Sequence, residues 1–221
     1  MTARPAKKPL GLYVHIPFCR QKCSYCDFYS LPHSEEKMDA YTAALVRHLE
    51  EVAPQAAAHQ ADTVYIGGGT PFAVDCAEFE KVLCAVDGLR KNGCEYTVEA
   101  GRPDVFSEDK LHLLKDHGVT RICINPQSFS DTTLQKIGRK HTAADVYRAF
   151  EMSAKYDFEI NLDLIAGLAD ETLADFEKSL EAAAGLAPEN ITVHCLCLKA
   201  GAKLKEETSY LDAPVVSEMV E

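Results

Sequence analysis

The segment INLDLIAG, residues 160–167, is apolar at nearly every position. Two more segments share this character, ICIN at residues 122–125 and ITVHCLCL at residues 191–198. Short apolar runs are typical of strands in a parallel sheet, because such strands are covered on both faces. A parallel pair also needs a crossover connection, which is normally a helix, and helix-like stretches separate these runs. The pattern therefore predicts an α/β fold built on a parallel sheet.

Strand-like and helix-like stretches alternate six times along the chain, without a linker rich in Pro, Gly or Ser. Eight such units close a TIM barrel in about 250 residues, so six units in 221 residues predict an incomplete (βα)6 TIM-like barrel. A doubly wound open sheet fits the same alternation and is the alternative. The expected strands are 10–18, 63–66, 96–100, 121–125, 160–165 and 191–198, and the expected helices are 35–52, 77–89, 107–116, 131–137, 143–156 and 174–184.

Composition and charge exclude several classes of protein. The 221 residues, 47% of them hydrophobic, suffice for one globular domain, 1–221, with a sizeable core. A net charge of −11 argues against nucleic acid or an anionic membrane as the main partner. No apolar run reaches the roughly 18 residues that a membrane-spanning helix needs, and the N-terminus lacks the pattern of a secretory signal. Nine cysteines, three of them within eight residues, indicate a reducing cytoplasm and a metal or catalytic role.

The three clustered cysteines follow the first expected strand as Cys19-x3-Cys23-x2-Cys26. Thiolates bind soft metals, and this spacing lets three sulfurs converge from one loop. A structural zinc site needs four ligands and is closed, whereas three ligands leave a coordination position open. The motif therefore favours an iron–sulfur cluster over zinc. The other six cysteines are predicted to be small buried apolar residues: Cys76, Cys84, Cys94, Cys123, Cys195 and Cys197.

Several ordered motifs resemble those of the radical S-adenosylmethionine (SAM) superfamily, and within it the oxygen-independent coproporphyrinogen III oxidase-like family. The EAGRPD stretch at 99–104 and the INPQ stretch at 124–127 look most like the coproporphyrinogen dehydrogenase (HemZ-type) branch, whereas the loop from Gln21 to Phe28 looks more like the heme chaperone (HemW-type) branch. The motifs are YVHIPFC at 13–19 with its cysteine spacing, GGGTP at 67–71, EAGRPD at 99–104, NPQS at 125–128, NLDLIAGL at 161–168 and TVH at 192–194.

The resemblance implies two cofactors and their partners. A [4Fe–4S] cluster would bind Cys19, Cys23 and Cys26 and leave its fourth iron for SAM. One electron would then cleave SAM to methionine and a 5′-deoxyadenosyl radical, which abstracts hydrogen from substrate. The implied partners are a small-molecule substrate, a porphyrinogen or heme, and an electron donor such as a flavodoxin or ferredoxin. A nucleic acid partner is not implied.

Nine residues match positions at which the family binds SAM. The two glycines let the ligand approach the backbone closely, and the planar fork of the arginine suits the SAM carboxylate. No residue is assigned a catalytic role. The matching residues are Tyr13 near the sulfonium, Tyr25 beside the adenine, Gly68, Gly69 and Thr70 at the amino group, Arg139 at the carboxylate, and Glu99, Gln127 and Asp163 as further polar contacts.

Some of these residues also have a purely structural explanation. Tyr13 also fits a half-buried strand aromatic, and Asp163 also fits a structural salt bridge. Arg102 and Asp104 suit a substrate that bears carboxylates, but an ion pair between them within the loop explains them equally well. His15 and His194 also lie on expected strands, and a lone strand histidine is more often a hydrogen-bonded core residue than a ligand or an acid, so neither is assigned a role.

Three functions follow from the resemblance. The leading one is a radical SAM oxidoreductase, resembling coproporphyrinogen III dehydrogenase of heme biosynthesis, that converts coproporphyrinogen III to protoporphyrinogen IX by oxidative decarboxylation. The second is a heme-binding or heme-delivery chaperone of the HemW type. The third is a truncated cluster-binding fragment without activity, since the chain is expected to lack the family's C-terminal domain. Without that domain the site would be open to water, which is unfavourable for a radical.

Overall fold

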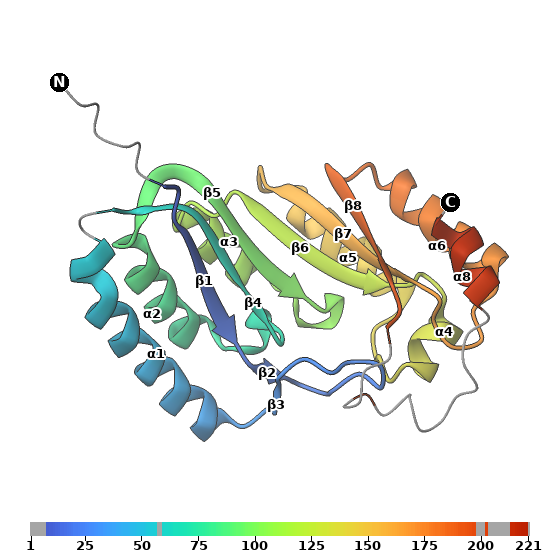
Figure 1. Ribbon diagram of the computed structural model, residues 1–221, viewed down its shortest axis with the longest axis horizontal. Coiled ribbons are helices and arrows are strands. Elements are labelled where there is room, and N and C mark those ends of the chain that lie inside the picture. Colours follow the sequence, from blue (N-terminus) through green and yellow to red (C-terminus); the bar gives the residue numbers. More distant parts are fainter. Residues whose placement is uncertain (1–7, 57–58, 198–201, 203–212, 221) are drawn as a thin grey trace.

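A computed structural model describes residues 8–56, 59–197, 202 and 213–220 (Figure 1). Six strands form one sheet in the order β1-β4-β5-β6-β7-β8, and each neighbouring pair is parallel. The order follows the chain without a reversal, which excludes the doubly wound alternative and confirms the incomplete TIM-like barrel. The strands are β1 Gly11–Ile16, β4 Ala61–Gly68, β5 Arg90–Gly101, β6 Arg121–Gln127, β7 Glu159–Ala166 and β8 Asn190–Cys195, and a separate pair is β2 Phe18–Cys19 with β3 Leu31–Pro32.

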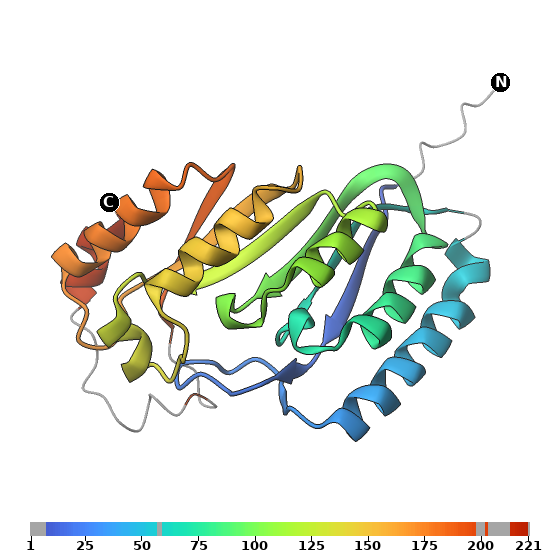
Figure 2. The ribbon, with the colours of Figure 1, turned by 180° about the vertical axis from the view of Figure 1, so that it is seen from behind.

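The crossover helices lie on one face of the sheet, as the view from behind shows (Figure 2). Helix α3 begins where the sequence predicts, because the hydroxyl of Ser107 accepts a hydrogen bond from the Lys110 amide. None of the helices in the described ranges is long and apolar enough to cross a membrane. The helices are α1 Glu35–Ala56, α2 Cys76–Asp87, α3 Glu108–Asp116, α4 Asp131–Lys136, α5 Ala143–Ser153, α6 Leu173–Gly185 and α8 Ala213–Val220, with short 3-10 turns η1 Pro71–Ala73 and η2 Pro103–Val105.

The two faces of the sheet differ in chemistry. Alternate strand residues such as Val98, Ile122 and Leu162 are fully buried among the helices. The intervening residues, such as Glu99 and Cys123, point to the face without helices and line a cavity. The expectation that the strands are covered by apolar packing on both faces is therefore wrong for this second face.

Some element boundaries differ from those predicted. Strand β5 begins at Arg90, well before the expected Tyr96, because Ala61 of β4 pairs with Arg90 through an irregular register. Strand β8 ends at Cys195, and the end of the expected run, Leu198, lies outside the described residues. Helix α8, Ala213–Val220, is absent from the predicted elements.

Candidate functional site

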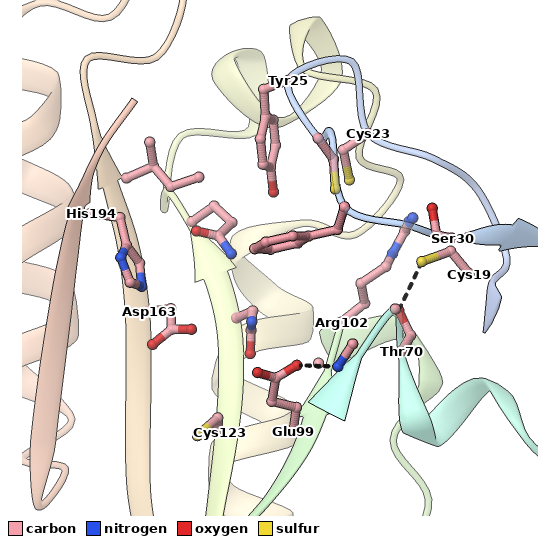
Figure 3. Close-up of a pocket in the computed structure, with 18 of the residues that line it drawn as sticks. Cys19, Cys23, Tyr25, Ser30, Thr70, Glu99, Arg102, Cys123, Asp163 and His194 are labelled. Carbon is pink, nitrogen blue, oxygen red and sulfur yellow. Dashed lines mark hydrogen bonds between the residues drawn. The ribbon is translucent and has the colours of Figure 1, made fainter. Parts of the chain in front are cut away.

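A cavity of about 620 Å³ opens at the carboxyl ends of the strands (Figure 3). Strands β4 to β8 line it, and the cysteine loop, residues 19–30, borders it on one side. The three cysteines lie around it together with eight of the nine residues expected to bind SAM. These cavity residues are Cys19, Cys23, Cys26, Tyr25, Gly68, Gly69, Thr70, Glu99, Gln127, Arg139 and Asp163.

The cysteine loop carries three free thiols at the cavity. Cys23 is buried, Cys19 and Cys26 are half-buried, and all three are free thiols. The loop is fixed to the region after α4 by the Ser24 amide, which donates to the Ile137 carbonyl at 3.1 Å. In the described ranges, no three His, Cys, Asp or Glu side chains lie close enough together to hold a single metal ion. A cubane cluster binds each thiolate to a different iron, so its ligands must surround a larger volume.

The Cys19 thiol has a protein partner on the glycine-loop side. The Thr70 hydroxyl donates to Cys19 Sγ at 3.7 Å (Figure 3). Burial raises the pKa of the Cys19 thiol, and burial likewise raises the pKa of Cys26. Metal binding must therefore displace protons from these two thiols, as it does in most thiolate sites.

The glycine loop, residues 67–69, has no room for side chains. A Cβ on Gly69 would lie 2.6 Å from the Phe18 carbonyl oxygen, and one on Gly68 would lie 2.6 Å from the His15 ring. Gly68 also has φ +119°, a conformation that favours glycine. This backbone therefore packs directly against Phe18 and His15, and Gly68 and Gly69 line the cavity without side chains.

Glu99 holds the glycine loop in position through hydrogen bonds. Its carboxylate accepts from the Gly68 amide at 3.1 Å and from the Tyr65 hydroxyl at 2.7 Å. Burial raises the pKa of Glu99, although these two hydrogen bonds favour the charged form. Glu99 thus both faces the cavity and orients the segment expected to receive the SAM amino group.

Arg139 and Gln127 form the opposite side of the cavity. The buried Arg139 guanidinium donates to the Asn125 carbonyl and, at 3.0 Å, to the Tyr25 hydroxyl, and it also contacts the Cys23 thiol. Gln127 adopts φ 69°, which is uncommon for a side-chain-bearing residue, and its Oε1 has no hydrogen-bond partner in the described structure. A buried cation and an unpaired acceptor side by side suit a ligand that carries both a carboxylate and an amino or hydroxyl donor.

Asp163 is held by an amide and not by a cation. The Asn161 side chain donates to its carboxylate at 2.6 Å, and no ion pair of Asp163 occurs in the described ranges. Burial raises the pKa of Asp163. The salt-bridge alternative is therefore wrong, and the carboxylate faces the cavity.

Tyr13 lies apart from the other expected SAM residues. Its ring stacks against Tyr65 with centroids 6.0 Å apart, its hydroxyl contacts Nδ1 of His15 at 3.0 Å, and 58% of the residue is exposed. It is not among the residues that line the cavity. The structure therefore places it as an exposed strand aromatic beside the site.

Several cavity residues were not predicted from the sequence. Cys195 and Cys197 are exposed and line the cavity, so their expected burial is wrong. It is also wrong for the exposed Cys84 and the half-buried Cys76, while Cys94 and Cys123 are buried as expected. The loop ion pair proposed as an alternative does form, between Arg102 and Asp104 at 3.0 Å. Six further cavity residues lie at strand positions that face the cavity, and the alternation of strand residues between two faces could have indicated them. They are Thr97, Arg121, Cys123, Asn161, Thr192 and His194.

The residues around the cavity fit the two groups expected there. The side-chain-free backbone of residues 67–69, the buried Arg139 cation and the unpaired Gln127 Oε1 match the amino acid part of SAM. Three free thiols on one loop, all lining the cavity, match a cluster held by three protein ligands.

Comparisons with known proteins agree with this fit. The family model of the radical SAM superfamily matches residues 13–183. The oxygen-independent coproporphyrinogen-III oxidase-like protein HemZ of Bacillus subtilis is 34% identical over 227 residues, which cover 97% of this chain and 45% of that protein. Heme chaperone HemW of the same organism is 37% identical over 165 residues, which cover 73% of this chain and 43% of that protein.

The fold also matches a solved structure, coproporphyrinogen III oxidase (HemN) from Escherichia coli, described as a radical SAM enzyme. The TM-score is 0.89 with 24% sequence identity, over 99% of this chain and 52% of that one. The chain thus spans about half the length of the relatives it matches.

The fold and the site define a radical SAM protein. The chain belongs to the radical SAM superfamily, and it is similar both to a coproporphyrinogen-III oxidase-like protein and to heme chaperones. Its cofactors are a [4Fe–4S] cluster and SAM, which the radical SAM superfamily uses.

Proposed function

We propose that this chain is the radical SAM core of an enzyme that decarboxylates coproporphyrinogen III oxidatively to protoporphyrinogen IX. The observation that carries the proposal is the cavity itself, around which the three cysteines and eight expected SAM residues gather. The similarity to the HemZ relative over nearly the whole chain supports this reaction.

When bound, SAM and the reduced cluster would supply a 5′-deoxyadenosyl radical that abstracts hydrogen beside the substrate ring. The protein's own residues bind SAM and orient it. Gly68 and Gly69 admit the SAM amino group to the backbone, Arg139 pairs with its carboxylate, and Gln127 accepts from a donor with its free Oε1. Cys19, Cys23 and Cys26 line the same cavity and would hold the cluster there.

The second candidate function is heme binding and delivery without decarboxylation. The similarity to several proteins named heme chaperone HemW, at 36–37% identity for those of Bacillus subtilis, Lactococcus lactis and Escherichia coli, favours it. In that function the cluster and SAM sites are the same, and the ligand is heme instead of a porphyrinogen. An electron donor such as a flavodoxin or ferredoxin belongs to either function.

One experiment separates the two functions. The chain is reconstituted anaerobically with iron and sulfide, reduced with dithionite and given SAM, with and without coproporphyrinogen III and a one-electron acceptor. The proposal predicts 5′-deoxyadenosine release that rises with the porphyrinogen, together with a decarboxylated product. Tight heme binding with no decarboxylation would instead establish the second function. A loaded cluster in a chain that neither cleaves SAM nor binds heme would contradict both and indicate a non-catalytic fragment.

A further inference from the structure

Arg102 is a buried cation beside the cysteine loop that the SAM site does not use. It follows Gly101, whose φ of +81° turns the chain at the end of β5, and only 4% of Arg102 is exposed. The side chain lines the cavity on the side of Cys19, as the close-up shows (Figure 3). A cation is costly to bury unless a charge or several hydrogen bonds compensate it.

Two contacts orient the Arg102 guanidinium. Nε donates to the Asp104 carboxylate at 3.0 Å, and one terminal nitrogen donates to the Gln21 carbonyl at 3.3 Å. Gln21 lies in the loop between the first and second cluster cysteines. The Asp104 side chain is 25% exposed, against 5% for that of Arg102, so solvent screens the carboxylate more than the cation.

The Arg102 guanidinium lies beside the first cysteine. Arg102 and Cys19 line the same side of the cavity, and the hydrogen bond to the Gln21 carbonyl holds the guanidinium against the loop that carries Cys19 (Figure 3). A [4Fe–4S] cluster on three thiolates carries a net negative charge, and one added electron increases that charge. A buried cation close to one ligand therefore stabilises the reduced cluster more than the oxidised one, since net charge and hydrogen bonds to sulfur set cluster potentials.

We propose that Arg102 is a positioning residue that anchors the cysteine loop through Gln21 and raises the reduction potential of the cluster held at Cys19. Asp104 opposes this effect by neutralising part of the charge. The inference rests on the cluster and not on the substrate, so it stands whether the porphyrinogen or the heme function is correct.

The test is an EPR-monitored redox titration of the reconstituted chain and three variants. Arg102→Gln removes the charge and is expected to shift the midpoint potential to a more negative value. Asp104→Asn leaves the cation uncompensated and is expected to shift it to a less negative value, by a smaller amount because of screening. Arg102→Lys keeps the charge and is expected to stay close to the unmodified chain.

Iron and sulfide content and the melting temperature of each variant serve as controls for folding. If loss of the hydrogen bond to Gln21 prevents the Arg102→Gln variant from holding a cluster, Asp104→Asn still tests the effect of the Arg102 charge on the midpoint potential, because it keeps that hydrogen bond. Midpoint potentials that are unchanged, or that shift in the same direction in Arg102→Gln and Asp104→Asn, would overturn the proposal. A purely structural role would lower cluster content without producing opposite shifts.

Discussion

Gly69 sets how closely the glycine loop packs against Phe18, because backbone atoms of Phe18 occupy the place where a side chain would be. Gly69→Ala would put a Cβ 2.6 Å from the Phe18 carbonyl oxygen, and backbone cannot yield as a flexible side chain can. We expect a loss of about 1–3 kcal/mol in the free energy of unfolding and weaker SAM binding, measured by denaturation and by equilibrium dialysis.

Gly185→Ala is the matched control for this change. Gly185 lies at the end of α6, and a Cβ there would meet nothing within 4 Å. We expect it to leave SAM binding unchanged and to stabilise the chain by up to about 1 kcal/mol. Equal losses in both variants would show that the loop geometry is not the cause.

Glu171 is a buried carboxyl behind the cavity wall. It is 5% exposed, its Oε1 accepts from the Ser128 hydroxyl at 2.9 Å, and its Oε2 has no partner in the described structure. Ser128 directly follows Gln127, and it also contacts Ser179 of α6 at 3.2 Å. Burial raises the pKa of Glu171 to about 7.

The chain is expected to lose stability as the pH rises toward neutrality because of this carboxyl. Between pH 4.5 and about 7 the folded state holds a proton that the unfolded chain releases, so the free energy of unfolding falls with pH, by up to about 3 kcal/mol. In Glu171→Gln, which still accepts from Ser128, this fall should be absent. Urea denaturation at several pH values measures it, with the exposed Glu181→Gln as control. The same slope in Glu171→Gln and the unmodified chain would contradict the assignment.

Single residues were predictable where a motif fixes them and not where packing does. The cysteines and the glycine loop could be placed because their spacing and their position after a strand have one chemical explanation. The exposure of Cys195 and Tyr13 could not, because both lie on the open face of the sheet, and the sequence does not show which face the helices leave uncovered. The burial of Arg102 depends likewise on a contact with Gln21, far away in sequence.

At the scale of elements, helix α5 depends on its N-terminal cap. The Thr142 hydroxyl accepts from the Asp145 amide, and the Asp145 carboxylate accepts from the Thr142 amide at 2.8 Å, which completes a capping box. Thr142→Ala should lower the free energy of unfolding by about 1 kcal/mol, and Thr142→Ser should restore most of it. Thermal denaturation measures both, and an alanine variant as stable as the serine variant would show that the cap contributes nothing.

The elements themselves were largely predictable, since each helix and strand carries its own period. The helices that follow the strands agree with expectation to within a few residues, and Ser107 caps α3 as predicted. The small pair β2 and β3 was not predicted, because two-residue strands carry no period. The first half of β5 was missed for another reason: its residues 90–95 are mostly polar, and pairing with β4 alone makes them a strand.

The whole molecule combines a helix-covered sheet face with an open polar face. Hydrophobic burial between the helices and residues such as Ile66 and Leu164 holds the strands in place. The other face is thereby free to present Glu99, Cys123 and Asp163 from three adjacent strands into one cavity. This division lets a stable scaffold carry a polar cofactor site at the carboxyl ends of its strands.

The central claim is that Cys19, Cys23 and Cys26 hold a cluster with one iron open to SAM. The most direct measurement is the EPR spectrum of the reconstituted, dithionite-reduced chain before and after SAM is added, with Cys23→Ala as control. The account predicts a [4Fe–4S] signal whose g-values change when SAM binds, and loss of the signal in Cys23→Ala. A spectrum that SAM leaves unchanged, or a full cluster retained in Cys23→Ala, would contradict it.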